Sequence, residues 1–100
     1  MVVDINNENF DKEVLEHKGV VIMDFYGTWC MPCKILAPIV DKVVEDQGIK
    51  LAKVDVDNNT ELVKRFGIMS VPTLIVFKDG VEVAKSSGVV SESRILELIK

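Results

Sequence analysis

The only two cysteines of this 100-residue chain, Cys30 and Cys33, lie at the junction between a predicted strand and a predicted helix. The stretch 20–25 before them is almost wholly apolar and predicts a buried strand, whereas 33–47 has apolar residues at helical spacing and predicts a helix. The first amide groups of a helix lack partners inside the helix, and together with the helix dipole they favour a negative charge. A thiolate is such a charge, so we expect Cys30, at the start of this helix, to be a nucleophile.

Cys33 lies three residues further along, one helical turn away and on the same face as Cys30. It is therefore close enough to attack a mixed disulfide formed at Cys30, and we expect it to be the more buried of the two cysteines. A Cys-x-x-Cys pair near a strand–helix junction is typical of redox proteins. The spacing therefore predicts thiol–disulfide exchange.

Three other interpretations of the cysteine pair are weaker. Two unreactive structural cysteines would fit scattered positions better than this spacing at the start of a helix. A zinc site needs about four ligands, and His17 is the only histidine, which leaves only a site shared by two chains. Covalent haem attachment needs a histidine after the second cysteine, and Lys34 occupies that position.

The composition predicts one globular domain over residues 1–100. An apolar fraction of 48% argues against disorder, and a net charge of −4 supplies no basic stripe for nucleic acid. We see no signal peptide at the N-terminus, and the apolar runs are only strand-length, so we expect no membrane partner. Two cysteines at catalytic spacing, with none left for a structural bridge, fit a reducing cytoplasm.

The order of the expected elements predicts an α/β fold. Pro38 lies inside the long helix and is expected to kink it, whereas Asp79-Gly80 is a two-residue hairpin signal between the last two strands. A mixed sheet of about five strands, covered on both faces by about four helices, accommodates this order. The expected strands are 2–5, 20–25, 51–56, 73–78 and 81–85, and the expected helices are a short one between Asn9 and Lys18, then 33–47, 60–66 and one capped by Ser91.

Asp24 is the one charged residue in the apolar strand 20–25. An ionised carboxylate is costly in such a strand, and burial should raise its pKa. The simpler alternative, that Asp24 reaches solvent at the end of the strand, stays open.

The chain resembles the thioredoxin family along nearly its whole length. The resemblance implies the thioredoxin fold, with Cys30 as the attacking cysteine and Cys33 as the resolving one. It also implies that Asp24 is the buried acid beneath the dithiol and that Lys53 is the partner of that acid. The features that agree in order are Asp24, Trp29-Cys30-x-Pro32-Cys33-Lys34, Ala37-Pro38, Ser70-Val71-Pro72-Thr73, Phe77-Lys78-Asp79-Gly80 and Gly88.

The same resemblance implies a site for client proteins beside the dithiol. Pro72 matches the family's cis-proline loop, whose backbone pairs with the substrate peptide. Two departures put partner choice in question: Met31 replaces the usual Gly, and Tyr26-Gly27 replaces the usual Trp-Ala. The residues expected to form the shallow substrate-binding surface are Trp29, Met31, Pro32, Gly67, Ile68, Val71, Pro72, Gly88 and Val89.

We therefore expect an enzyme, a protein-disulfide reductase that works through a mixed disulfide and holds no cofactor or metal. The resemblance implies disulfide-containing client proteins and a flavin-containing thioredoxin reductase as partners, and we expect a monomer. A disulfide oxidase or isomerase is the alternative within redox chemistry, although such relatives usually carry histidine where Pro32 stands. A non-catalytic docking module is the alternative from another class.

Overall fold

The structure, a computed structural model, describes all residues 1–100 and is built on one five-stranded sheet. The strands are β1 (Val2–Asp4), β2 (Val20–Tyr26), β3 (Lys50–Asp55), β4 (Thr73–Lys78) and β5 (Val81–Ser87), and the helices are η1 (Asp11–Leu15), α1 (Met31–Gln47), α2 (Thr60–Phe66) and α3 (Glu92–Leu98). None of these helices combines the length and the apolar character needed to cross a membrane.

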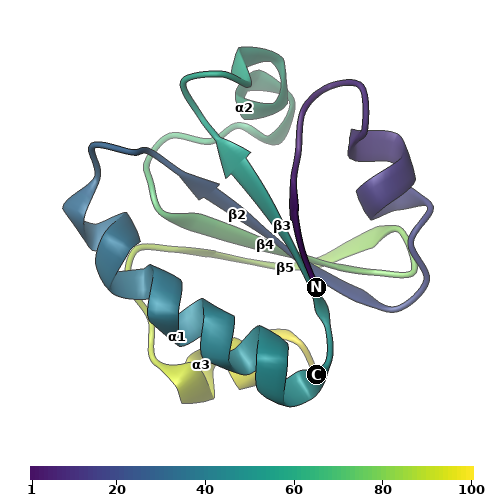
Figure 1. Cartoon of the computed structure of the whole chain (residues 1–100), viewed down its shortest axis with the longest axis vertical. Helices are drawn as coiled ribbons and strands as arrows, with labels where there is room; N and C mark the ends of the chain where they lie inside the picture. Colours follow the sequence, from purple (N-terminus) through teal and green to yellow (C-terminus); the bar gives the residue numbers. More distant parts are fainter.

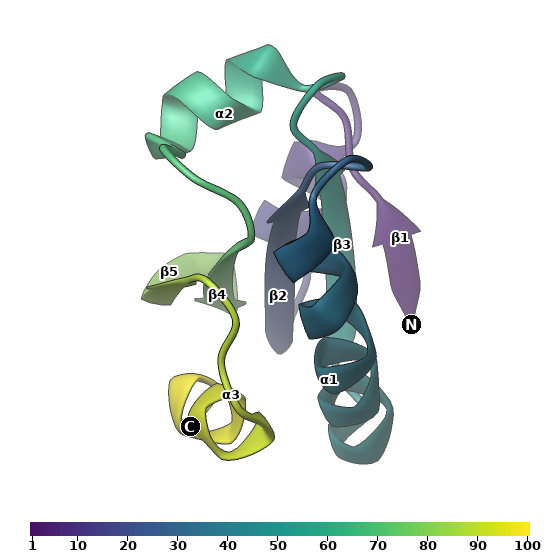
Figure 2. The ribbon, with the colours of Figure 1, turned by 90° about the vertical axis from the view of Figure 1, so that its left-hand side faces the viewer.

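The sheet is mixed, in the order β1-β3-β2-β4-β5, and β2 lies at its centre. β2 pairs in parallel with β3 and antiparallel with β4. Helices α1 and α3 cover one face of the sheet, and η1 and α2 cover the other (Figures 1 and 2). The predicted mixed sheet with helices on both faces is therefore confirmed.

Alternation along β2 divides the core into two layers. Successive side chains of a strand point to opposite faces, so Val21, Met23 and Phe25 join the apolar core beneath η1 and α2. Ile22 points the other way, into the core beneath α1 and α3. Asp24 shares the parity of Ile22 and therefore faces the side of the sheet that α1 covers.

The long helix α1 begins with Met31, two residues earlier than expected, and ends at Gly48, which adopts the left-handed conformation with φ 63°. Leu36, Val40, Val43 and Val44 form its buried side. Pro38 lies on the exposed side, and the helix continues through it from Met31 to Gln47 without a break. Pro38, which was expected to kink the helix, therefore does not interrupt it, because packing of the opposite side holds the helix on the sheet.

The first helix differs in type from the one predicted. Phe10 and Val14 are buried, and residues Asp11–Leu15 form one π-helical turn, with Glu16 N donating to Asp11 O at 2.9 Å. The buried Lys50 ammonium donates to the carboxylate of Glu13 at 2.6 Å and to its carbonyl oxygen at 2.9 Å. This pairing fastens the turn to β3.

Candidate active site

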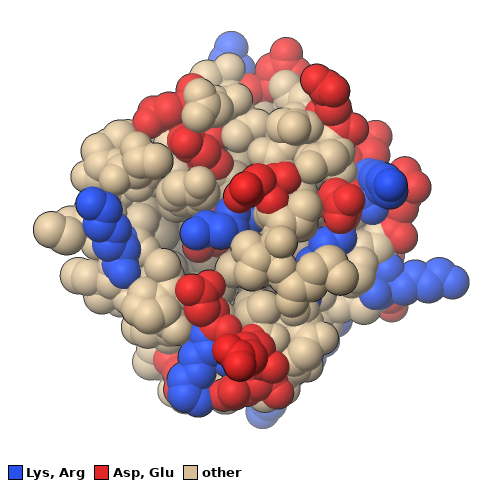
Figure 3. All heavy atoms as spheres, in the orientation of Figure 1, with Lys and Arg blue, Asp and Glu red and all other residues tan.

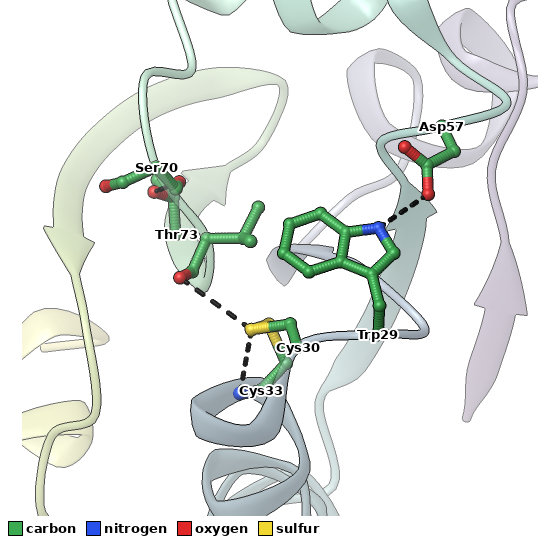
Figure 4. Close-up of a disulfide and its surroundings, with 7 residues drawn as sticks. Trp29, Cys30, Cys33, Asp57, Ser70 and Thr73 are labelled. Atoms are coloured by element: carbon green, nitrogen blue, oxygen red, sulfur yellow. Dashed lines mark hydrogen bonds between the residues drawn. A yellow bond between two sulfur atoms is a disulfide. The ribbon is translucent and has the colours of Figure 1, made fainter.

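The two cysteines form a disulfide at the start of α1 (Figure 4). Cys30 is the N-cap residue, with extended backbone, and its Sγ accepts a hydrogen bond from Cys33 N at 3.2 Å. Pro32 lies in the first turn, where the missing amide hydrogen costs no helical hydrogen bond. The helix start therefore presents an amide directly to the sulfur of Cys30, which would stabilise a thiolate there.

The expectation that Cys33 is the more buried cysteine is wrong. Cys30 is 4% exposed and Cys33 is 7% exposed, so both are buried to nearly the same degree. The loop before Thr73 covers Cys30 from the far side, with the carbonyl oxygen of Val71 3.8 Å from its Sγ. The two cysteines therefore differ in their hydrogen-bond environment rather than in their access to solvent.

Asp24 lies on β2 and is 4% exposed. Its Oδ1 has no hydrogen-bond partner, so the carboxylate is poorly compensated. Burial raises the pKa of Asp24 to about 6; the charge of Lys53 opposes this rise and that of Asp41 adds to it. The alternative that Asp24 reaches solvent at the strand end is therefore wrong.

A cavity of about 260 Å³ brings Asp24, Cys33 and Lys53 to one place. Lys53 is the residue of β3 paired in register with Asp24, and its ammonium lies 4.9 Å from the centre of the Tyr26 ring. The face shown in Figure 3 is hollowed between the first turn of α1 and strands β2 and β3, and acidic and basic side chains lie interspersed over it. The cavity is large enough to hold water beside this carboxyl group and Cys33.

The loop before β4 lies against the disulfide. Its Val71–Pro72 peptide bond is cis, as the resemblance implied. Thr73 Oγ1 donates to Ser70 O at 2.8 Å, and Gly88 N donates to Pro72 O at 2.9 Å. These two hydrogen bonds hold the loop at the N-terminal end of β4, beside Cys30.

Comparison with known proteins identifies the family. A family model described as Thioredoxin matches residues 1–100. The chain belongs to the thioredoxin family. It is 39% identical over 100 residues to the thioredoxin of Bacillus subtilis (strain 168), covering 98% of this chain and 94% of that protein.

Other thioredoxins agree in sequence and in fold. The chain is 44% identical over 82 residues to the thioredoxin of Listeria monocytogenes serovar 1/2a, covering 80% of this chain and 78% of that one. A solved mutant thioredoxin from Halobacterium salinarum NRC-1 superposes with a TM-score of 0.89 at 35% identity, covering 98% of this chain and 87% of that chain. The predicted thioredoxin fold is confirmed.

Thioredoxins are disulfide oxidoreductases, and Cys30-Met31-Pro32-Cys33 is the redox-active sequence of this one. The predicted activity, reduction of protein disulfides by a dithiol, is therefore confirmed at the level of the family. Disulfide-containing substrates and a reductase that restores the dithiol follow from this membership.

The exposed indole of Trp29 lies beside the disulfide (Figure 4). Its Nε1 donates to Asp57 Oδ2 at 2.8 Å. The N-cap residue Asn59 of α2 makes no side-chain capping bond, and the nearby Asp57 accepts the hydrogen bond from the indole. No local sequence pattern predicts this contact, because 28 positions separate the two residues.

The residues expected to bind substrate are only partly gathered in one pocket. An apolar pocket of about 210 Å³ contains three of them, Trp29, Ile68 and Val71. Met69, which was not predicted, lines the same pocket and is 95% exposed. The others do not line this pocket. Met31 and Pro32 are exposed on the first turn of α1, Gly67 follows α2, Pro72 is buried in its loop, and Gly88 and Val89 follow β5.

No three of the histidine, cysteine, aspartate and glutamate side chains gather into a group that could hold a metal ion. The groups that this site offers are the Cys30–Cys33 dithiol, the buried carboxyl group of Asp24 and the apolar pocket beside Trp29.

Proposed function

We propose that Cys30 attacks the disulfide of a client protein and that Cys33 resolves the resulting mixed disulfide. The Cys30 thiolate forms a bond to one client sulfur, and the other client sulfur leaves as a thiolate. Cys33 then attacks Cys30 Sγ, which forms the Cys30–Cys33 disulfide and releases the second client thiolate. Two electrons pass from the dithiol to the client. The Cys33 N–H that points at Cys30 Sγ carries this assignment.

Asp24 takes the proton from Cys33 before that second attack. Its carboxyl group and Cys33 line the same cavity, and a pKa of about 6 leaves it mostly ionised at neutral pH, ready to accept a proton. Lys53 lines the cavity on the neighbouring strand and favours the ionised carboxylate. Asp24 and Lys53 therefore serve the proton transfer, whereas covalent bonds form and break only between sulfur atoms.

Clients dock on the apolar surface beside the disulfide. The exposed side chains of Trp29 and Met31 supply apolar contacts, and the pocket lined by Ile68 and Val71 accepts an apolar side chain. The backbone around Pro72 pairs with the client as an added strand. Pro32, Gly67, Gly88 and Val89 complete the surface.

The remaining partners follow from this reaction. A flavin-containing thioredoxin reductase returns two electrons to the Cys30–Cys33 disulfide. The chain acts as a single domain over residues 1–100, as a monomer, in the cytoplasm. These assignments rest on the resemblance and on a cysteine content that leaves no structural bridge.

The test is the reduction of insulin disulfides with dithiothreitol as the electron source. The wild-type protein should accelerate the reaction strongly, and Cys30→Ser should not. The equilibrium potential against glutathione separates a reductase from an oxidase, because a strongly oxidising value would favour the oxidase alternative. A double Cys30→Ser, Cys33→Ser variant that retains full cellular function would favour the docking module.

A further inference from the structure

The indole of Trp29 folds back onto the backbone of Gly27. Cys30 N donates to Gly27 O at 3.2 Å, which closes a tight turn and leaves the Trp29 side chain on the Gly27 side. A Cβ atom at residue 27 would lie 2.7 Å from Cε2 and 2.8 Å from Cζ2 of the indole. Ordinary contact begins at 3.4 Å, so any side chain at this position would have to displace the ring.

Gly27 is not required by backbone conformation. The other five glycines, Gly19, Gly48, Gly67, Gly80 and Gly88, all have φ between 62° and 101°, where glycine is strongly favoured. Gly27 is not among these positive-φ residues, so an alanine could adopt its backbone angles. Glycine matters here because it has no side chain, and the indole of Trp29 occupies the space that a side chain would fill.

A hydrogen bond also holds the indole at the part of the ring that faces Gly27, since Nε1 would lie 3.1 Å from a Cβ at residue 27. Its Nε1 donates to Asp57 Oδ2 at 2.8 Å, and its ring lines the 210 Å³ pocket together with Ile68 and Met69. Figure 4 shows the ring between the disulfide and Asp57. The contact with Gly27 and the hydrogen bond to Asp57 together fix the position of the Trp29 ring, which forms one wall of the pocket.

We propose that Gly27 is a positioning residue that sets the shape of the pocket for apolar client side chains through Trp29. This inference rests on the proposed docking of clients at Trp29. A Cβ at residue 27 pushes the ring away from the backbone, weakens its hydrogen bond to Asp57 and alters the pocket wall.

The test is Gly27→Ala, with kinetics on two disulfides of different size. For insulin, KM should rise about two- to tenfold, the factor that corresponds to the net worth of one hydrogen bond, whereas kcat should change less than twofold. For 5,5′-dithiobis(2-nitrobenzoic acid), a small disulfide that does not need the pocket, the rate should stay within twofold. Trp29 is the only tryptophan, so its emission spectrum should shift and report the displaced ring directly.

A double-mutant cycle with Trp29→Ala supplies the control. In the Trp29→Ala background, adding Gly27→Ala should leave KM for insulin unchanged, because no ring remains to be displaced. An unchanged emission spectrum or an unchanged KM in Gly27→Ala would overturn the inference, and so would an equal rise of KM in the Trp29→Ala background. A wild-type protein that fails to reduce insulin would instead refute the proposed function, so the two failures are distinguishable.

Discussion

Removing the charge of Asp24 should stabilise the folded protein, and the gain should depend on pH. The pKa of this carboxyl group is raised from 3.8 to about 6, mainly by burial. At roughly 1.36 kcal/mol for each pKa unit, this difference corresponds to about 3 kcal/mol of unfolding free energy. The ionised carboxylate is therefore a substantial destabilising feature for a domain of this size.

The sign of the pH dependence follows from the direction of the shift. Below pH 3.8 the carboxyl group is protonated in both the folded and the unfolded chain, and burial carries no charge penalty. Between pH 3.8 and about 6 the carboxyl group ionises in the unfolded chain but not yet in the folded one. The unfolding free energy of the wild type therefore falls by roughly 3 kcal/mol over this interval. Above about pH 6 both states are ionised, and the loss stays constant.

Asp24→Asn keeps the shape of the side chain and removes the titration. The buried amide adds an unsatisfied-group cost of about 1–3 kcal/mol, but this cost is the same at every pH. Other carboxyl groups, such as Glu13 with its lowered pKa, titrate equally in both proteins and cancel in the difference. The stability of Asp24→Asn relative to wild type should therefore rise by about 2 kcal/mol from pH 4 to pH 7.

Urea unfolding of both oxidised proteins at pH 4, 5, 6 and 7 measures this difference, with equal m-values as the check on two-state behaviour. A difference in unfolding free energy that stays constant across these pH values would refute the argument. It would mean that Asp24 ionises in the folded protein as it does in the unfolded chain.

Two further outcomes are expected from the geometry at the helix start and at the indole. Limiting iodoacetamide, added to the reduced protein near neutral pH, should label Cys30 before Cys33, since Cys33 N–H points at Cys30 Sγ. Peptide mass spectrometry measures the ratio of labelled Cys30 to labelled Cys33. Faster labelling of Cys33 would reverse the assignment of Cys30 as the nucleophile. Asp57→Ala should cost about 1 kcal/mol of stability or less, because the bond is exposed, and should shift Trp29 emission; an unchanged spectrum would show that the bond does not hold the ring in solution.

Local signals predicted much of the fold. The range Thr60–Phe66 of α2 and the range Thr73–Lys78 of β4 agree with the predicted ones residue for residue. Gly67 ends the first range in the left-handed conformation, and Asp79-Gly80 ends the second in a turn with φ of 51° and 83°. The end of a helix or strand at such residues depends only on the local sequence, so it can be predicted directly.

Contacts between distant segments could not be predicted in this way. The Trp29–Asp57 hydrogen bond, the Lys50–Glu13 pair and the place of Met69 in the pocket each depend on how elements pack in three dimensions. The near-equal burial of the two cysteines has the same origin, because the loop carrying Val71 covers Cys30 from across the site. Asp24 was predictable because a charge in an otherwise apolar strand is itself a local signal.

The division of roles between the cysteines is tested most directly by trapping the mixed disulfide. Reduced Cys33→Ser and reduced Cys30→Ser are each mixed with oxidised insulin, quenched with excess iodoacetamide, and resolved by mass spectrometry without reductant. Cys33→Ser should accumulate a covalent complex through Cys30, because the intramolecular attack that would release it is absent, and Cys30→Ser should accumulate little. Equal complex from both variants would contradict the assignment of Cys30 as nucleophile, and no complex from either would contradict thiol–disulfide exchange through a mixed disulfide.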